Sequence, residues 1–300
     1  MIRLTLTVIL VFLFPVVYGQ KLYKDSIYSR VKVTSHKYYT VNSETMDFEF
    51  YRATGAKGKI PLIIYVHGGG FSAGTQNSKG IQYFAKRLAC RGYAVASLSY
   101  RLTLKGKNAE CEITAAQKKE AIENASFDIV SGVKHILKYD STFSIDRKRI
   151  ILVGSSAGGE TVLNIVYNYD YSKSLADFKF AGVISMSGAL TSLDNLTKSN
   201  AIPTQLFHGT NDAVVPFNTA PQYVCDQRKD DSLMMYGSET IAKKLKEFGT
   251  PYYLFLIGGG THSWAGMPTV NCFGEIADFL YNDVLFPTYV RKTERIVQEK

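Results

Sequence analysis

The stretch Gly154–Gly159, which reads Gly-Ser-Ser-Ala-Gly-Gly, decides how the rest of the chain is interpreted. It follows the apolar run Ile150–Val153 and precedes Glu160–Val166, whose spacing of apolar residues predicts a helix. The order is therefore strand, sharp turn and helix, and a G-x-S-x-G motif centred on Ser156 lies on the turn. Glycine and serine are also common in ordinary loops, so the motif alone does not identify Ser156 as a nucleophile. That interpretation needs a base, an acid and oxyanion donors elsewhere in the chain.

Strand-like and helix-like segments alternate along the remaining sequence. A hairpin is expected at 32–51, buried strands at 60–66, 93–100, 180–186, 205–207 and 252–257, and helices at 81–88, 112–138, 238–248 and 273–284. This alternation predicts an α/β fold with a mainly parallel sheet of about eight strands and helices on both faces. Residues 189–201 are too few for a lid domain between two strands, and 220–236 are expected to be an irregular segment that partly walls the site.

A candidate base and a candidate acid each follow a predicted strand. His262 lies in a glycine-rich loop directly after the last strand, and Asp212 lies in the loop after 205–207. Both project from the edge of the sheet that presents Ser156, where open α/β sheets bind their ligands. Serine is a poor nucleophile unless a base lies within hydrogen-bond reach and is held by a third group, so Ser156, His262 and Asp212 are predicted to act together.

Nearby residues offer alternatives for two of these roles. Ser155 is a second possible nucleophile, but it does not have glycines at the positions two before and two after it. Asp230 and Asp231 are rivals for the acid, although neither directly follows a strand. His208 ends a strand ahead of the acid and is expected to satisfy backbone groups rather than to catalyse.

Donors for a developing oxyanion are expected in the loop His67-Gly68-Gly69-Gly70-Phe71, directly after the strand at 60–66. Its bare backbone N–H groups can approach a substrate closely, and the N–H of Ala157 at the start of the next helix would be the other donor. A phosphate-binding loop is not supported, because neither a Gly-Lys-Ser/Thr nor a G-x-G-x-x-G pattern is present there.

With these motifs together, the chain resembles α/β-hydrolases of the esterase and lipase group that carry an HGGG oxyanion loop, the hormone-sensitive-lipase-like and carboxylesterase-like branch. The resemblance extends from the strand at 60–66 to the last helix. It implies an α/β-hydrolase fold, and the chain order Ser, Asp, His agrees with it; the near absence of a lid region departs from the pattern of many members. The site residues that it implies are the nucleophile Ser156, the base His262, the acid Asp212 and the oxyanion donors Gly69, Gly70 and Ala157. Phe71 and Trp264, which flank the motifs, are the candidate substrate-binding side chains.

The expected reaction is hydrolysis of carboxylic esters through an acyl-enzyme, with no cofactor and no metal. Ser155 stands where many members of the group carry Asp or Glu, and the short lid region argues against a true lipase. Exported lidless members often act on acyl groups attached to polysaccharides, so removal of acetyl or feruloyl groups is the natural role that the resemblance implies. A serine peptidase or amidase using the same three residues is the enzymatic alternative, and a non-catalytic binding module on the same fold is the other.

The first residues predict export. A short basic head ending at Arg3 precedes an apolar run through Val17, and Val17 and Gly19 are small enough for a signal-peptidase site, so cleavage is expected after Gly19. Residues 1–19 are thus a predicted signal peptide, residues 20–300 one catalytic domain, and the protein is expected to be secreted or periplasmic. No stable membrane insertion of the mature chain is expected, and the sequence does not predict the oligomeric state.

The sequence contains four cysteines and an excess of basic residues. Cys90, Cys111, Cys225 and Cys272 lack zinc-site spacing, and an oxidising compartment permits disulfides among them. Three full pairings are possible; Cys90–Cys111 with Cys225–Cys272 is preferred, and free thiols are the alternative.

The net charge of +9 is spread along the chain rather than gathered into an aromatic-rich basic stripe, so a nucleic-acid partner is not predicted.

Overall fold

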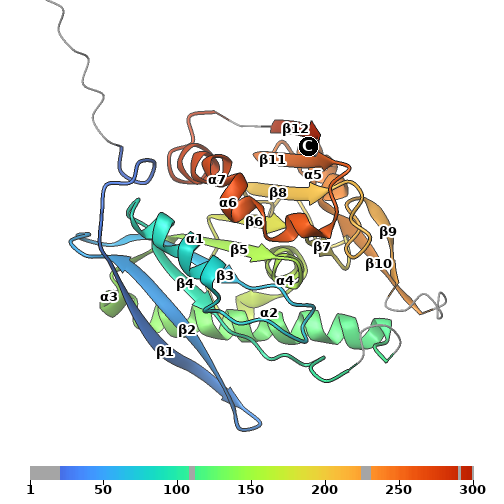
Figure 1. Ribbon diagram of the computed structural model, residues 1–300, viewed down its shortest axis with the longest axis horizontal. Coiled ribbons are helices and arrows are strands. Elements are labelled where there is room, and N and C mark those ends of the chain that lie inside the picture. Colours follow the sequence, from blue (N-terminus) through green and yellow to red (C-terminus); the bar gives the residue numbers. More distant parts are fainter. Residues whose placement is uncertain (1–20, 108–111, 224–230, 290–291, 299–300) are drawn as a thin grey trace, which may run out of the picture.

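The computed structural model describes residues 21–107, 112–223, 231–289 and 292–298. Within these residues, nine strands form one sheet in the order β1-β2-β4-β3-β5-β6-β8-β11-β12. Strands β1 (Val31–Val41) and β2 (Glu44–Ala53) are antiparallel to each other, and β2 is antiparallel to β4 (Ala94–Leu98). The strands from β4 onward run parallel (Figure 1). The predicted α/β architecture is therefore confirmed, with one strand more than expected.

The central strands are buried because helices cover them on both faces. Every residue of β3 (Ile60–Val66), β6 (Gly182–Met186) and β8 (Thr204–Gly209) is buried, as is the run 150–154 in the second half of β5 (Ile145–Ser155). β11 (Tyr252–Gly258) is buried up to its last residue. Continuous apolar runs of this kind are typical of parallel strands buried on both faces.

Two hydrophobic cores lie on the two faces of this sheet. The first contains side chains of α2 (Ala115–Lys138), α4 (Ala157–Tyr167) and α5 (Ser238–Phe248), and the second those of α1 (Lys79–Ala89) and α7 (Phe273–Phe279). The short α6 (Pro268–Asn271) precedes α7, and α3 (Asp140–Phe143) leads into β5. A turn of π-helix at Leu280–Leu285 extends α7, so the single helix expected at 273–284 changes its winding there.

Local sequence signals explain where several of these elements begin and end. Asn42 and Ser43 join β1 to β2 with positive φ angles of 48° and 65°, the backbone of a tight hairpin turn. Thr114 and Gln117 form a reciprocal capping box at the start of α2. Gly249 ends α5 in the left-handed conformation, with φ of 76°.

Two segments differ from the expectation. Within 220–236, which was expected to be irregular, β9 (Thr219–Tyr223) and β10 (Ser232–Gly237) pair as an antiparallel hairpin, because β10 also finds the backbone of β7 (Ala189–Leu190) to pair with. At the other edge of the large sheet, β12 (Lys292–Gln298) pairs with β11. Residues 187–203, all of them described, contain β7 and turns, which agrees with the expected lack of a lid there.

The preferred disulfide pairing is wrong for both described cysteines. Cys90, just after α1, and Cys272, between α6 and α7, are free thiols. Cys272 is buried among apolar side chains, and burial raises the pKa of its thiol to about 11, which keeps it protonated and unreactive. Cys111 and Cys225 lie outside the described residues, as does the predicted signal peptide.

Candidate active site

Ser156 occupies a strained turn between β5 and α4. Its φ of 53° and ψ of −121° lie outside the regions that residues with a side chain ordinarily adopt. The neighbouring glycines make this turn possible: a Cβ on Gly154 would lie 2.1 Å from the carbonyl oxygen of Gly158, and one on Gly158 would lie 2.1 Å from that of Val66. The G-x-S-x-G motif is therefore a steric requirement of this turn.

The structure brings Ser156, His262 and Asp212 together from loops after β5, β11 and β8. The Oγ of Ser156 lies 2.8 Å from Nε2 of His262, and Nδ1 of the same ring lies 2.8 Å from Oδ2 of Asp212. With its proton on Nδ1, the imidazole donates to the carboxylate and leaves Nε2 free to accept the serine proton. This chain of two hydrogen bonds is the arrangement that activates a serine.

The alternative nucleophile Ser155 and the alternative acid Asp231 form hydrogen bonds with other partners. The hydroxyl of Ser155 donates to the carbonyl oxygen of Ala265 at 2.7 Å, and so ties the end of β5 to the short helical turn at His262–Ala265. Oδ1 of Asp231 accepts from the backbone N–H of Ala115 at the start of α2. Asp230 lies outside the described residues.

Asp212 is held as a carboxylate by several donors. Its side chain is fully buried, and Oδ1 accepts from the backbone N–H groups of Val214 and Val215, both at 2.9 Å. Burial alone would raise its pKa, but the hydrogen bonds from His208, His262 and the Val215 N–H outweigh this and hold the pKa well below the usual range. The acid is thus charged and fixed in orientation.

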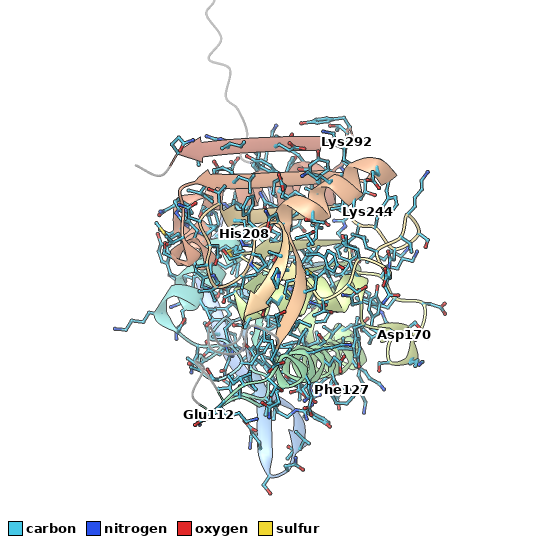
Figure 2. The ribbon with its side chains drawn as sticks, turned by 90° about the vertical axis from the view of Figure 1, so that its right-hand side faces the viewer. Glu112, Phe127, Asp170, His208, Lys244 and Lys292 are labelled. Carbon is cyan, nitrogen blue, oxygen red and sulfur yellow. The ribbon has the colours of Figure 1, made fainter. Side chains whose placement is uncertain are left out.

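His208 contacts the acid, which the sequence analysis did not predict. Its Nε2 lies 3.0 Å from the carbonyl oxygen of Val215, as expected of a residue that satisfies backbone groups, and also 3.4 Å from Oδ2 of Asp212. Its Nδ1 lies 2.8 Å from Oγ of Ser238, and the side chain is fully buried. Figure 2, which views the edge at which β5 and β8 end, labels His208 close to the middle. The sequence did contain an indication of this contact, because His208 and Asp212 are four residues apart on either side of a strand end.

The glycine-rich loop lies directly against the nucleophile turn. A Cβ on Gly68 would lie 2.8 Å from the carbonyl oxygen of Ser155 and 3.1 Å from Cβ of Ser156. Gly69 and Gly70 have φ angles of 118° and 62°, which favour glycine. Within the described part of the chain, the backbone N–H groups of Gly69, Gly70 and Ala157 donate no hydrogen bond. They are therefore available to an oxygen atom bound beside Ser156.

Phe71 lies under this loop rather than at its surface. Its side chain is fully buried, with the Lys118 ammonium 4.7 Å from its ring centroid, so the predicted contact of Phe71 with substrate would require the loop to move. Trp264 is half-buried and packs against the core that contains Ile257, and its contact with substrate stays a prediction.

A buried ion pair that was not predicted supports Phe71. Nζ of Lys118 in α2 lies 2.7 Å from Oε2 of Glu160 in the first turn of α4, and the Glu160 side chain is fully buried. The N-terminal end of α4 also favours a negative charge at this position. The pair joins the helix that begins at Ala157 to the underside of the glycine-rich loop.

One cavity borders the acid. It has a volume of about 290 Å³ and lies between the Asp212 loop and β9, with Val214, Phe217 and Gln222 among its lining residues. The amide nitrogen of Gln222 donates to the Val214 carbonyl oxygen at 2.6 Å, so the β9–β10 hairpin supports the loop that carries Asp212.

In the described ranges no helix has the length and apolar character needed to cross a membrane. Those same ranges contain no His, Cys, Asp and Glu cluster suited to a metal ion.

Comparisons with known proteins agree with this geometry. Residues 48–193 match the BD-FAE family model. Gut esterase 1 of Caenorhabditis elegans is 31% identical over 121 residues, which cover 39% of this chain and 21% of the relative. Fumonisin B1 esterase of Sphingopyxis macrogoltabida is 26% identical over 147 residues, 48% of this chain and 26% of the relative. The matches thus span between a fifth and about a quarter of the length of these curated relatives.

Among solved structures, the butyrate-bound esterase Est2 of Thermogutta terrifontis superposes with a TM-score of 0.61 at 18% identity, covering 86% of this chain and 96% of that one. This likeness shows the fold. Together with the family model, which matches just under half of the chain, it shows that the chain has the α/β-hydrolase fold and is similar to esterases.

Proposed function

We propose that this protein hydrolyses carboxylic esters, with Ser156 as nucleophile, His262 as base and Asp212 as acid. Ser156 Oγ attacks the ester carbonyl carbon while its proton passes to Nε2 of His262. The oxyanion of the tetrahedral intermediate receives hydrogen bonds from the N–H groups of Gly69, Gly70 and Ala157. The imidazolium then gives its proton to the departing alcohol, and water repeats the sequence to release the acid.

The observation that carries this proposal is the unbroken chain from Ser156 Oγ through His262 to Asp212, with 2.8 Å at each hydrogen bond. The names of the related proteins, gut esterase and fumonisin B1 esterase, support esters as the substrate class. An amide leaving group needs stronger protonation than an alcohol, so esters are the substrates that this site should cleave faster.

The test compares wild type with Ser156→Ala on 4-nitrophenyl acetate. We expect kcat to fall by about 10⁴ or more in folded protein. Activity near wild type would contradict the assignment. A matched pair of substrates, 4-nitrophenyl acetate and 4-nitroacetanilide, separates esterase from amidase; faster cleavage of the anilide would favour the amidase.

For the natural substrate, we propose an acyl group attached to a polysaccharide, such as acetyl or feruloyl. Support comes from the resemblance to lidless exported esterases and from the short segment at 187–203, which contains β7 and turns but no lid domain. The expected export, with removal of residues 1–19, would place the enzyme where such polymers occur. Release of acetate or ferulate from plant-wall polysaccharide is the test, and activity on small esters alone would contradict it. N-terminal sequencing of the secreted protein should begin at Gln20.

A further inference from the structure

A second cavity lies far from Ser156, at the opposite edge of the sheet. It has a volume of about 320 Å³ and is formed by β1, β2, the turn after β2, and α3. The cavity borders Phe143, which lies just before the first residue of β5, whereas Ser156 follows the last residue of that 11-residue strand. Strand β3 pairs with β5 from Ile145 to Gly154 and has seven residues, so at about 3.3 Å per residue the two sites are on the order of 20 Å apart. This cavity is therefore not part of the proposed ester site.

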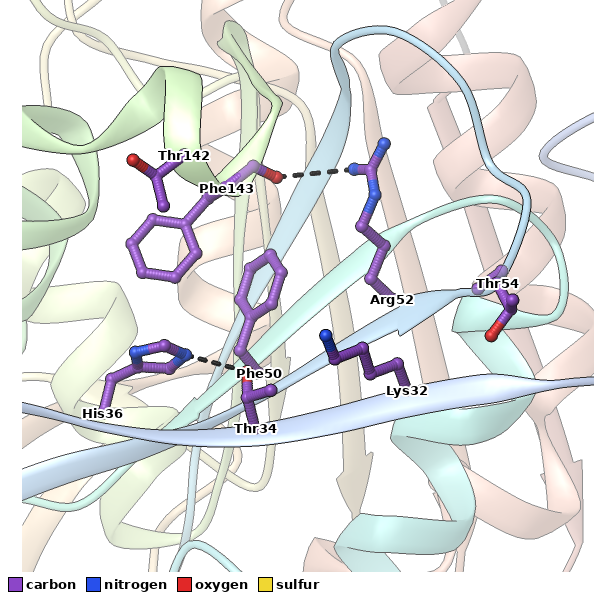
Figure 3. A pocket seen from close by; sticks show the side chains of 9 residues that line it. Lys32, Thr34, His36, Phe50, Arg52, Thr54, Thr142 and Phe143 are labelled. Atoms are coloured by element: carbon purple, nitrogen blue, oxygen red, sulfur yellow. Dashed lines mark hydrogen bonds between the residues drawn. The ribbon is translucent and has the colours of Figure 1, made fainter.

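The walls of the cavity are apolar and its rim is cationic. The rings of Phe50 and Phe143 lie 4.8 Å apart, and the edge of the His36 ring meets Phe143 at 5.1 Å. Figure 3 shows Lys32 and Arg52 on one side of Phe50 and His36 on the other. The remaining lining residues are Thr34, Ala53, Thr54 and Thr142, so the lining carries three hydroxyl groups and no carboxylate.

The two cations face each other across the hairpin. Lys32 and Arg52 are direct partners in the register of β1 and β2, a placement that is destabilising for like charges. Within the described residues neither forms an ion pair. Asp140, the acidic residue of α3, lies 3.9 Å from Lys59 and 3.7 Å from Arg147 instead. The rim therefore has positive charge that no protein carboxylate in this part of the structure neutralises.

Arg52 is fixed in place by the backbone around it. Its two terminal nitrogens donate to the carbonyl oxygens of Phe143, Ser144, Ala56 and Gly58 at 3.0–3.4 Å. Figure 3 shows the first of these bonds, from Arg52 to Phe143. These contacts hold a positive charge at the cavity without a counter-ion, and Lys32, an exposed residue of β1, is the second cation at the rim. A preorganised charge beside an apolar slot is a typical recognition site for an amphiphilic anion.

We propose that this cavity binds a small aromatic carboxylate. The flat ring would pack against the wall that Phe50 and Phe143 form, and the carboxylate would accept hydrogen bonds from Lys32 in the field of Arg52. The volume, at the lower end of the range for small-molecule sites, suits one ring with its carboxylate.

Titration of the protein with 4-fluorobenzoate, followed by ¹⁹F NMR, tests this proposal. We expect a dissociation constant on the order of 1 mM or below, a value suited to a ligand of this size. The uncharged isostere 4-fluorobenzamide should bind at least about tenfold more weakly, because a hydrogen bond to a charged group is lost.

Lys32→Gln is the diagnostic variant, and Lys37→Gln, on the exposed opposite face of the same strand, is its matched control. We expect Lys32→Gln to weaken binding of 4-fluorobenzoate about tenfold or more and Lys37→Gln to leave it unchanged. Equal binding to both variants, equal binding of the benzamide, or no binding up to about 10 mM would overturn the proposal. Neither lysine touches the proposed catalytic residues, so these results do not depend on whether the protein is an esterase.

Discussion

Replacing Asp212 by Asn tests how the acid controls the base. In the structure Oδ1 of Asp212 accepts two backbone N–H groups, while Oδ2 faces Nδ1 of His262. An Asn that keeps its oxygen toward the two N–H donors must place its NH₂ group against His262. The imidazole then has to accept on Nδ1, its proton moves to Nε2, and it can no longer take the proton of Ser156.

The expected loss can be worked from these contacts. If the amide flips to restore the correct tautomer, its NH₂ group faces the N–H donors of Val214 and Val215, which leaves one buried and one partly buried donor without an acceptor. Each such loss costs about 1–3 kcal/mol, so the competent arrangement lies about 2–6 kcal/mol above the inactive one. At about 1.4 kcal/mol per factor of ten, kcat should fall by roughly 30-fold to 10⁴-fold.

The assay is hydrolysis of 4-nitrophenyl acetate under saturating conditions, with thermal unfolding as the check on folding. Asp231→Asn is the matched control, because that carboxylate serves the start of α2 instead of the base. It should leave kcat unchanged within about a factor of two. If Asp212→Asn kept kcat within tenfold of wild type, the role assigned to the acid would be refuted.

Four further results follow from the geometry. The pKa of Asp212 is held below its usual range, so the stabilising effect of this carboxylate is complete above about pH 5 and is lost as pH falls. Between about pH 5 and pH 2, urea titrations should therefore show a larger loss of unfolding free energy for wild type than for Asp212→Asn. Ser155→Ala removes the 2.7 Å hydrogen bond to the turn that carries His262, and kcat should fall about three- to tenfold with little change in KM, whereas an unchanged kcat would show that this bond does not position the base. Gly158→Ala places a methyl group 2.1 Å from the Val66 carbonyl oxygen and should lower the unfolding free energy by about 3 kcal/mol or more; a thermal midpoint equal to wild type would contradict the steric argument. Lys118→Met leaves the buried Glu160 charge without its partner and should cost about 3–5 kcal/mol in denaturant unfolding, unlike Lys119→Met on the exposed face of α2.

The elements that sequence reasoning predicted are those with strong local signals. The buried strands β3 and β11 are apolar runs of the right length. Helix α5 ends at Gly249, whose left-handed conformation favours glycine. Ser156, Asp212 and His262 each follow a predicted parallel strand, so strand order alone placed them at one edge of the sheet. The steric demands of the turn around Ser156 are also local, which is why its glycines could be recognised.

What the sequence did not predict depends on partners far away in the chain. The strand β12 is polar and mostly exposed, and it is a strand because the edge of β11 is available to it. Lys118 and Glu160 are 42 residues apart, and nothing local to either residue indicates that they meet in the core. The disulfide preference failed for the same reason, since spacing along the chain does not determine whether two thiols approach each other.

The most direct test of the central claim is labelling of the folded protein with a fluorophosphonate probe, followed by peptide mapping by mass spectrometry. A serine activated by the His262–Asp212 pair should react stoichiometrically, and hydrolysis of 4-nitrophenyl acetate should be lost in parallel. The structure predicts one adduct, on Ser156, and none on Ser156→Ala. An adduct on Ser155, or a folded protein that hydrolyses the ester without being labelled at Ser156, would contradict the mechanism.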